Sequence, residues 1–137
     1  MLHLLIAATD EPVDVEEAKR RLRFDGDALD ADIRRMISAG REAVEQQTGY
    51  ALAEASYSWS PVGTGAELPI QPAIVTSEEG VRPILITTKP GPAPESLRSA
   101  VIFMVGEMLR NPELTVEQVA ENPVFQQLVF PWRRVLP

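Results

Sequence analysis

Side chains that could carry out catalysis are scarce in this chain. Its 137 residues include one histidine, His3, and no cysteine, which excludes disulfides, thiol catalysis and thiolate metal sites. A Ser-His-Asp arrangement would depend on His3 alone, near a chain end where residues are often poorly ordered. Gly63-Thr64-Gly65 lacks the remaining glycines of a dinucleotide-binding loop, and the sequence has no Gly-Lys-Ser/Thr phosphate-binding loop. We therefore expect no enzymatic activity and no cofactor.

A cluster of four aspartates could supply oxygen ligands to a divalent cation. Its spacing does not match an EF-hand, because Asp30 occupies the position that requires glycine and Met36 the position of the closing glutamate. Stabilisation of a helix start by negative charge explains the cluster more simply. We expect no metal site, and an enzyme that uses this cluster with a divalent ion is the alternative. The cluster comprises Asp25, Asp27, Asp30 and Asp32.

The charge balance restricts the partners of the protein. The chain carries 13 Lys and Arg against 20 Asp and Glu, a formal net charge of -7, which disfavours tight binding of nucleic acid or of an anionic membrane surface. Its longest apolar stretches, residues 4–8 and 101–105, are far shorter than the roughly 20 residues that span a bilayer. We expect a cytoplasmic protein without membrane contact. A basic cluster is interpreted as a solvated face with local ion pairs, with a subunit or DNA contact as the alternative: Lys19, Arg20, Arg21 and Arg23.

The last sixteen residues differ in character from the rest of the chain. No acidic residue follows Glu121, and the charged side chains from Asn122 to Pro137 are two arginines. Three of the eight aromatic residues also lie here, and aromatic and arginine side chains commonly supply the hot spots of protein interfaces. We interpret the segment as a surface that docks on another protein; the alternative is that it completes the core of its own subunit. The candidate docking residues are Phe125, Leu128, Phe130, Trp132, Arg133 and Arg134.

Capping signals and a 3.6-residue apolar period predict two helices in the first third of the chain. Asp14 and Glu17 have the spacing of a capping box before a helix over residues 15–23. Asp27 is expected to cap a second and longer helix. That helix should end at Gly49, because glycine readily takes the left-handed conformation after a last helical turn.

A segment rich in turn residues follows the second helix. Residues 51–93 hold six of the twelve prolines and four of the eight glycines, so helix is disfavoured there. Apolar and β-branched residues at 55–60 and 84–88 predict short strands. An isolated hairpin is marginal in water, so these strands must pack on the helices or on another subunit.

Helical spacing returns at Pro94 and continues to residue 110, and the capping pair Thr115 and Gln118 opens a short helix to about residue 121. The predicted fold is therefore mainly α: a small helical bundle with a short β-rich insertion between the second and third long helices. We expect a single domain over residues 1–137, helical over 14–49 and 94–121, with a β and loop insertion at 51–93 and a docking tail at 122–137.

Several short motifs follow one another in a fixed order along the chain. They are Glu-Pro-Val at 11–13, Val-Glu-Glu-Ala-Lys at 15–19, an aspartate-rich stretch at 27–32, Thr-Gly at 48–49, Met-Leu-Arg-Asn at 108–111 and Phe-Pro-Trp-Arg at 130–133. The ordered set resembles the small head-tail connector proteins, or adaptors, of long-tailed phages and of phage-like gene transfer agents.

The resemblance implies a structural subunit rather than an enzyme. Such adaptors form a ring beneath the portal of a DNA-filled head, extend the DNA channel and present a surface to the tail. The implied partners are the portal protein, a stopper or tail-completion protein, and copies of the same chain in a dodecameric ring, with DNA only as transiting cargo. The segment from Phe125 to Arg134 would engage the portal, in a virion or phage-like particle assembled in the bacterial cytoplasm. The rival hypothesis is a monomeric, acidic, helical protein-binding module.

Overall fold

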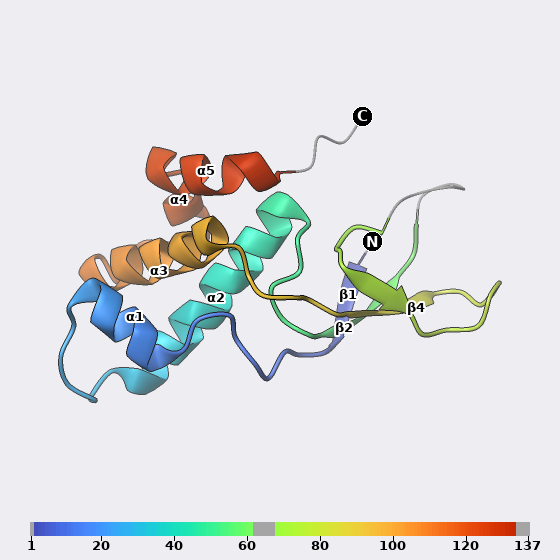
Figure 1. Ribbon diagram of the computed structural model, residues 1–137, viewed down its shortest axis with the longest axis horizontal. Helices are drawn as coiled ribbons and strands as arrows, with labels where there is room; N and C mark the ends of the chain where they lie inside the picture. The colour runs from blue at the N-terminus through green and yellow to red at the C-terminus, as the bar shows by residue number, and fades with distance from the viewer. Residues whose placement is uncertain (1, 62–67, 134–137) are drawn as a thin grey trace.

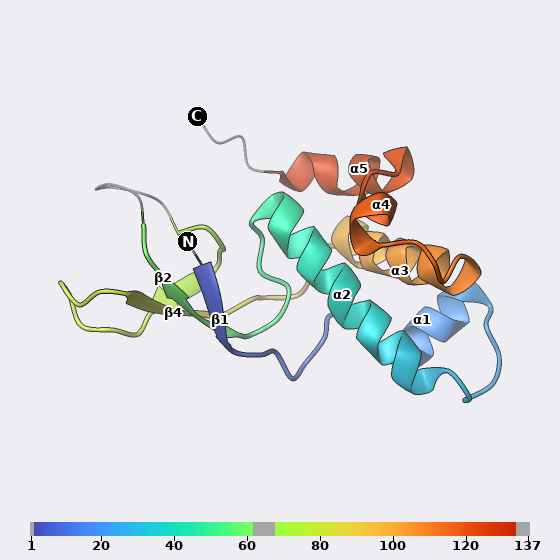
Figure 2. The same ribbon diagram turned by 180° about the vertical axis from the view of Figure 1, so that it is seen from behind.

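The computed structural model describes residues 2–61 and 68–133. Helices gather at one end of the molecule, and a small sheet lies at the other (Figures 1 and 2). The connections from α2 to β2 and from β4 to α3 run between the two ends. In chain order the elements are β1 (Leu2–Ile6), α1 (Val15–Leu22), α2 (Asp30–Thr48), β2 (Ser56–Trp59), β3 (Ala73–Val75), β4 (Ile84–Thr88), α3 (Glu95–Arg110), α4 (Val116–Ala120), α5 (Pro123–Val129) and the 3-10 turn η1 (Phe130–Trp132).

The prediction of a mainly α fold is wrong. Within the described residues, five α-helices accompany a four-stranded antiparallel sheet with the order β1-β2-β4-β3, so the fold is α+β. The strands are not confined to an insertion between helices, because β1 precedes every helix and pairs with β2. The strand β1 is apolar at four of its five positions and shows no alternation, so its strand character depends on a partner distant in sequence.

The start of α1 is set by the predicted cap. The Asp14 carboxylate accepts a hydrogen bond from the Glu17 amide at 2.7 Å, which satisfies one of the free amides of the first turn. The Glu17 side chain does not complete the box, because it pairs with Arg98 on α3. The helix ends at Leu22, and Arg23 adopts the left-handed conformation with a φ of 56°.

The predicted cap of α2 is wrong, whereas its predicted end is confirmed. The helix begins at Asp30 after Leu29, which makes no side-chain capping bond. Asp27 instead accepts a hydrogen bond from the Lys19 ammonium group. At the other end Gly49 is left-handed with a φ of 69°, and its amide donates to the Glu45 carbonyl.

The predictions for α3 and α4 are confirmed. The helix α3 follows Pro94 and runs to Arg110. Before α4 both halves of the capping box form: the Thr115 hydroxyl accepts from the Gln118 amide at 3.1 Å, and the Thr115 amide donates to Gln118 Oε1 at 2.9 Å. None of the helices in residues 2–61 and 68–133 is both long enough and apolar enough to cross a bilayer.

The main core lies between α2 and α3, and every other helix adds to it. Gly40 allows the two helices to approach closely, since a Cβ at this position would lie 3.4 Å from Val101 Cγ1 and 3.4 Å from its carbonyl oxygen. The sheet has a smaller core of its own. The three buried residues of the sheet core are Ala51, Ile70 and Ile86.

The cap of α1 yields a first prediction. We expect Asp14→Ala to lower the free energy of unfolding by about 1 kcal/mol, because the Glu17 amide loses its acceptor. Denaturation by urea measures the change. Asp10→Ala removes a nearby exposed carboxylate that caps no helix and should change stability by less than about 0.5 kcal/mol. Equal losses in the two variants would show that net charge, and not the cap, is responsible.

Candidate docking surface

The carboxy-terminal segment begins as a helix that packs on its own subunit. Asn122 caps α5 by accepting from the Val124 amide at 2.9 Å, and Pro123 occupies the first turn. Phe125 and Val129 are fully buried, four residues apart on the face of α5 that contacts α3. Leu128 is half-buried against the same core. These three residues pack against the core of their own subunit.

The side chains that follow α5 are exposed, in contrast to the buried residues of that helix. Phe130 is 71% exposed and Trp132 is 38% exposed. Arg133 lies on the surface and donates to Gln126 Oε1 at 3.3 Å. We call these three residues the carboxy-terminal strip. Arg134, the sixth candidate docking residue, lies outside the described residues, as does Gly63-Thr64-Gly65.

Two residues that the sequence did not single out hold Trp132 in place. Its indole N–H donates to the Ser96 hydroxyl at 2.8 Å. Its ring meets the Tyr50 ring edge to face, with centroids 5.4 Å apart at 70°, a favourable arrangement for two aromatic rings. The strip is thus fixed against the first turn of α3 and the residues after α2. A hollow of about 470 Å³ lies beside Trp132 and is also lined by Tyr50, Gln71 and Pro72.

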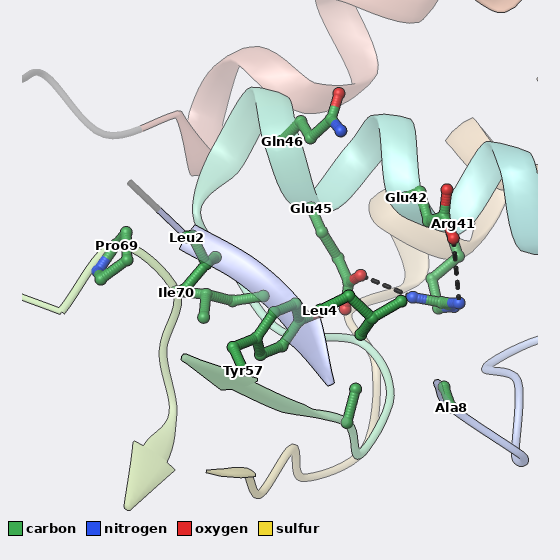
Figure 3. A pocket seen from close by; sticks show the side chains of 11 residues that line it. Leu2, Leu4, Ala8, Arg41, Glu42, Glu45, Gln46, Tyr57, Pro69 and Ile70 are labelled. Atoms are coloured by element: carbon green, nitrogen blue, oxygen red, sulfur yellow. Dashed lines mark hydrogen bonds and ion pairs between the residues drawn. The ribbon is translucent and has the colours of Figure 1, made fainter. Parts of the chain in front are cut away.

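A second surface feature is a pocket of about 410 Å³ between α2 and the sheet. Figure 3 shows Leu2, Leu4 and Tyr57 on its sheet side and Arg41 and Glu45 on its helix side. The pocket therefore has an apolar wall from β1 and β2 and a charged wall from α2. Arg41 and Glu45 in this wall are the most strongly buried charged residues that the structure describes.

Two residues of this wall, Arg41 and Glu45, form a charged cluster with Glu11, which precedes α1. Arg41 donates from Nε to Glu11 Oε2 at 2.6 Å and from an Nη to Glu45 Oε1 at 2.7 Å. The second oxygen of Glu45 accepts from the Leu52 amide at 2.8 Å, and the second oxygen of Glu11 accepts from the Ser38 hydroxyl at 2.7 Å. Every oxygen of both carboxylates therefore has a donor. The cluster of Arg41, Glu45 and Glu11 joins α2 to the connection between β1 and α1 and to the residues that follow α2. We call it the clamp.

The surroundings of the clamp shift the pKa values of its members. Burial lowers the pKa of the Arg41 guanidinium, but the hydrogen bond to Glu11 and the charge of Glu45 outweigh burial, so the net pKa is raised. Burial raises the pKa of Glu45, and the Leu52 amide and Arg41 oppose this only in part. Burial, with the charge of Glu45, also raises the pKa of Tyr57. A neutral Tyr57 and a paired Arg41 suit packing, and neither is an activated nucleophile or base.

Three aspartates of the predicted acidic cluster form ion pairs with basic side chains. Lys19 donates to Asp30 at 2.9 Å and to Asp27 at 3.0 Å, and these contacts raise the pKa of Lys19 above its ordinary value. Asp32 pairs with Arg35 on the next turn of α2. In the described part of the chain no three His, Asp or Glu residues are placed to hold a metal ion together. Asp27 and Asp30 thus share the single positive charge of Lys19.

No protein-family model matches the chain, and no curated protein matches its sequence. Among solved structures, a chain in the neck of an empty gene transfer agent particle, computed with C6 symmetry, superposes with a TM-score of 0.73. The superposition covers 100% of this chain and 97% of the other, at 17% sequence identity. The two chains have the same fold. The likeness therefore includes the sheet and β1 as well as the helices.

The source of the solved neck chain can be compared with the particles that the sequence motifs indicated. It belongs to a gene transfer agent particle, one of the two kinds of particle that the motifs indicated. At 17% sequence identity, this likeness shows the fold alone. Membership of the connector family stays a prediction.

Proposed function

We propose that this chain is a structural, non-enzymatic subunit of the neck of a phage-like particle. The observation that carries the proposal is the superposition on a neck chain over 100% of this chain and 97% of the other, with a TM-score of 0.73. A match of this extent includes every element that could form a subunit contact. The motif order of the sequence points independently to the same part of the particle.

The finer proposal is a head-tail connector, or adaptor. In it, copies of the chain form a dodecameric ring beneath the portal, extend the DNA channel and bind a stopper or tail-completion protein on the far side. The C6 symmetry applied to the solved neck is compatible with rings of repeated subunits. A net charge of -7 also suits a channel through which DNA slides, because a basic lining would bind the phosphates and slow transit.

The carboxy-terminal strip is the proposed portal contact. It combines an exposed phenylalanine, a half-exposed tryptophan held by Ser96, and a surface arginine in a region without acidic residues. These residue types dominate the energetics of protein interfaces. Since Trp132 is already fixed by its own subunit, little conformational freedom is lost when it binds. The subunit would assemble with its portal in the bacterial cytoplasm and remain in the particle.

Phe130→Asp tests the portal contact. We expect this variant to bind its cognate portal ring at least tenfold more weakly than the wild type, because one buried hot-spot side chain contributes about 2 kcal/mol. Its thermal stability should be unchanged, since Phe130 is 71% exposed. Binding is measured by surface plasmon resonance on immobilised portal.

Val81→Asp is the matched control. It makes the same chemical change at a side chain that is 47% exposed and lies between β3 and β4, so it should leave portal affinity unchanged. Wild-type affinity in Phe130→Asp would remove the strip from the interface. Absence of binding by the wild type would remove the connector proposal itself.

The burial of Phe125 and Val129 favours a second candidate, a monomeric acidic protein-binding module. A subunit whose α5 is already packed needs no ring to be stable. Light scattering of the chain with and without the cognate portal separates the two. A connector gives a complex of the portal with several copies, whereas the module stays monomeric in the mixture. A monomer without portal is compatible with both candidates, because the portal can act as a template for the ring.

A further inference from the structure

Among the described residues, no strand pairs with the outer side of β1 or β3, although Gln71, just before β3, forms a parallel bridge with Tyr50. In the order β1-β2-β4-β3, the strands β1 and β3 are the outer ones. Within residues 2–61 and 68–133, their backbone hydrogen bonds go to β2 and β4, and none links the outer side of either strand to another segment. Each edge therefore presents backbone groups that a further strand could pair with.

Two rows of side chains cross the sheet, one on each face, and both rows end in exposed aliphatic residues. In the first row the inner residues are a half-buried tyrosine and a fully buried isoleucine. In the second the inner residues are Ser56 and Thr87, whose hydroxyls lie 3.0 Å apart. The end residues are between 49% and 66% exposed. The rows are Leu4–Tyr57–Ile86–Val75 and Ile6–Ser56–Thr87–Ile74.

Neither edge strand contains a charged residue or proline that would hinder strand pairing, although β1 has a register shift between Leu4 and Ile6 and β3 is short. Soluble proteins blunt exposed edges with charged residues or proline within the strand. The strand β1 reads Leu-His-Leu-Leu-Ile and β3 reads Ala-Ile-Val, without acidic residue, lysine, arginine or proline. Exposed aliphatic residues along an open edge are typical of a strand that is covered in the assembled protein.

A second copy of this chain can cover each edge and continue the antiparallel order of the sheet. All neighbouring strands are antiparallel and the sheet has four of them, so β1 and β3 run in opposite directions. When the next copy is added in the same orientation, its β1 lies antiparallel to β3 and the alternation continues. The same addition places Leu4 of the added copy beside Val75 in one row and Ile6 beside Ile74 in the other.

We propose that β1 of one subunit pairs with β3 of the next, with Leu4 beside Val75 on one face and Ile6 beside Ile74 on the other. The contact is head-to-tail, and such contacts close into rings when the rotation per subunit permits. The inference rests on the proposed neck function in one respect: a closed ring needs the portal or a similar template. The contact is short, because β3 has three residues, so isolated subunits associate weakly and those held side by side on a template associate tightly.

Disulfide trapping tests this pairing, and the native chain contains no cysteine to interfere. Leu4→Cys and Val75→Cys variants are mixed at high concentration, alone and on the cognate portal, and oxidised. We expect a disulfide-linked heterodimer. The mismatched pair of Leu4→Cys with Ile74→Cys is the control, because Ile74 lies on the opposite face of the sheet from Leu4.

The double variant Leu4→Cys/Val75→Cys gives a second readout. The two positions of one chain are separated by three strand spacings, about 14 Å, which exceeds the roughly 7 Å between Cα atoms that a disulfide can span. Its disulfides are therefore intermolecular, and we expect a ladder of oligomers on a non-reducing gel.

Each outcome bears separately on the pairing and on the function. Heterodimers no more abundant than in the mismatched control, both free and on the portal, would overturn the pairing, as would a predominance of Leu4→Cys homodimers, which indicate pairing of β1 with β1. Normal portal binding without the ladder would contradict the pairing of β1 with β3 and would be compatible with the connector function. A ladder in a chain that does not bind the portal would leave the pairing standing and remove the connector.

Discussion

Replacing Arg41 with leucine is expected to lower the free energy of unfolding by about 3–5 kcal/mol. Arg41 is 5% exposed and Glu45 is 6% exposed, and the two groups bond at 2.7 Å. Loss of the guanidinium leaves a buried carboxylate whose remaining donors are the backbone amides of Leu52 and Ala53. Glu11 loses a bond as well. Urea denaturation at neutral pH measures the loss.

The double variant Arg41→Leu/Glu45→Gln separates the buried charge from the packing of Arg41. The glutamine keeps an oxygen for the Leu52 amide but carries no charge, so we expect the double variant to be more stable than Arg41→Leu alone. A loss below about 1 kcal/mol in the single variant would contradict the assignment of the clamp as a buried ion cluster. If the double variant is no more stable than Arg41→Leu, the loss of stability comes from the packing of Arg41 and not from the buried charge.

The pH dependence of the Arg41→Leu defect follows from the pKa of Glu45. Burial already raises that pKa, and Arg41 opposes the rise, so the variant has a still higher pKa in the folded state. A carboxyl with a raised pKa binds its proton more tightly in the folded protein, and the folded state therefore loses stability as the pH rises through that pKa. The defect should shrink from neutral pH to about pH 5. A defect that grows on acidification would contradict this account.

Phe125→Ala is expected to cost about 3–5 kcal/mol, which is the usual loss when a buried phenylalanine is truncated. Phe125 is completely buried under α5, against the core that α3 provides. Phe130→Ala, five residues further along, should change stability by less than about 0.5 kcal/mol, since its side chain is mostly exposed. Thermal unfolding of the two variants measures the difference.

This pair of variants tests the division of the carboxy-terminal segment into a core part and a docking part. Comparable losses of stability in both would mean that the strip also packs on its own subunit. A small loss in Phe125→Ala would mean that α5 is not part of the stable core. Deletion from Asn122 onward is a poorer test of docking, because it removes Phe125 and Val129 from the core together with the strip.

Local signals in the sequence located the ends of several helices correctly. The caps Asp14 and Thr115, the terminating Gly49 and the opening Pro94 act through their own backbone neighbourhood. Asp27 failed as a cap because a residue on another helix, Lys19, competes for its carboxylate. Such competition depends on tertiary structure and has no signature in a short window of sequence.

The sheet was underestimated for a related reason. The strands β1 and β3 are short, and they are strands because β2 and β4 pair with them. The partner of β1 lies far along the chain, and β3, which pairs with the next strand, has three residues, so neither periodicity nor propensity could identify them. The sequence predicted β2 and β4 as short strands of an insertion, and the mainly α prediction followed from missing β1 and β3, which complete the sheet.

The candidate docking residues could have been divided further from the sequence. Phe125, Leu128 and Val129 have the three- and four-residue spacing of one helical face, which places them together on the core side of α5. Phe130 breaks that spacing and is exposed. The support of Trp132 by Tyr50 and Ser96 could not be predicted, because these residues meet it only in the folded chain.

Electron microscopy of the purified chain mixed with its cognate portal tests the central proposal most directly. We predict a ring of this protein coaxial with the portal, with the carboxy-terminal strip of each copy against the portal and the sheets continuous from copy to copy. Portal particles that carry no added ring, with the chain left free in solution at concentrations well above those used for binding, would contradict the account.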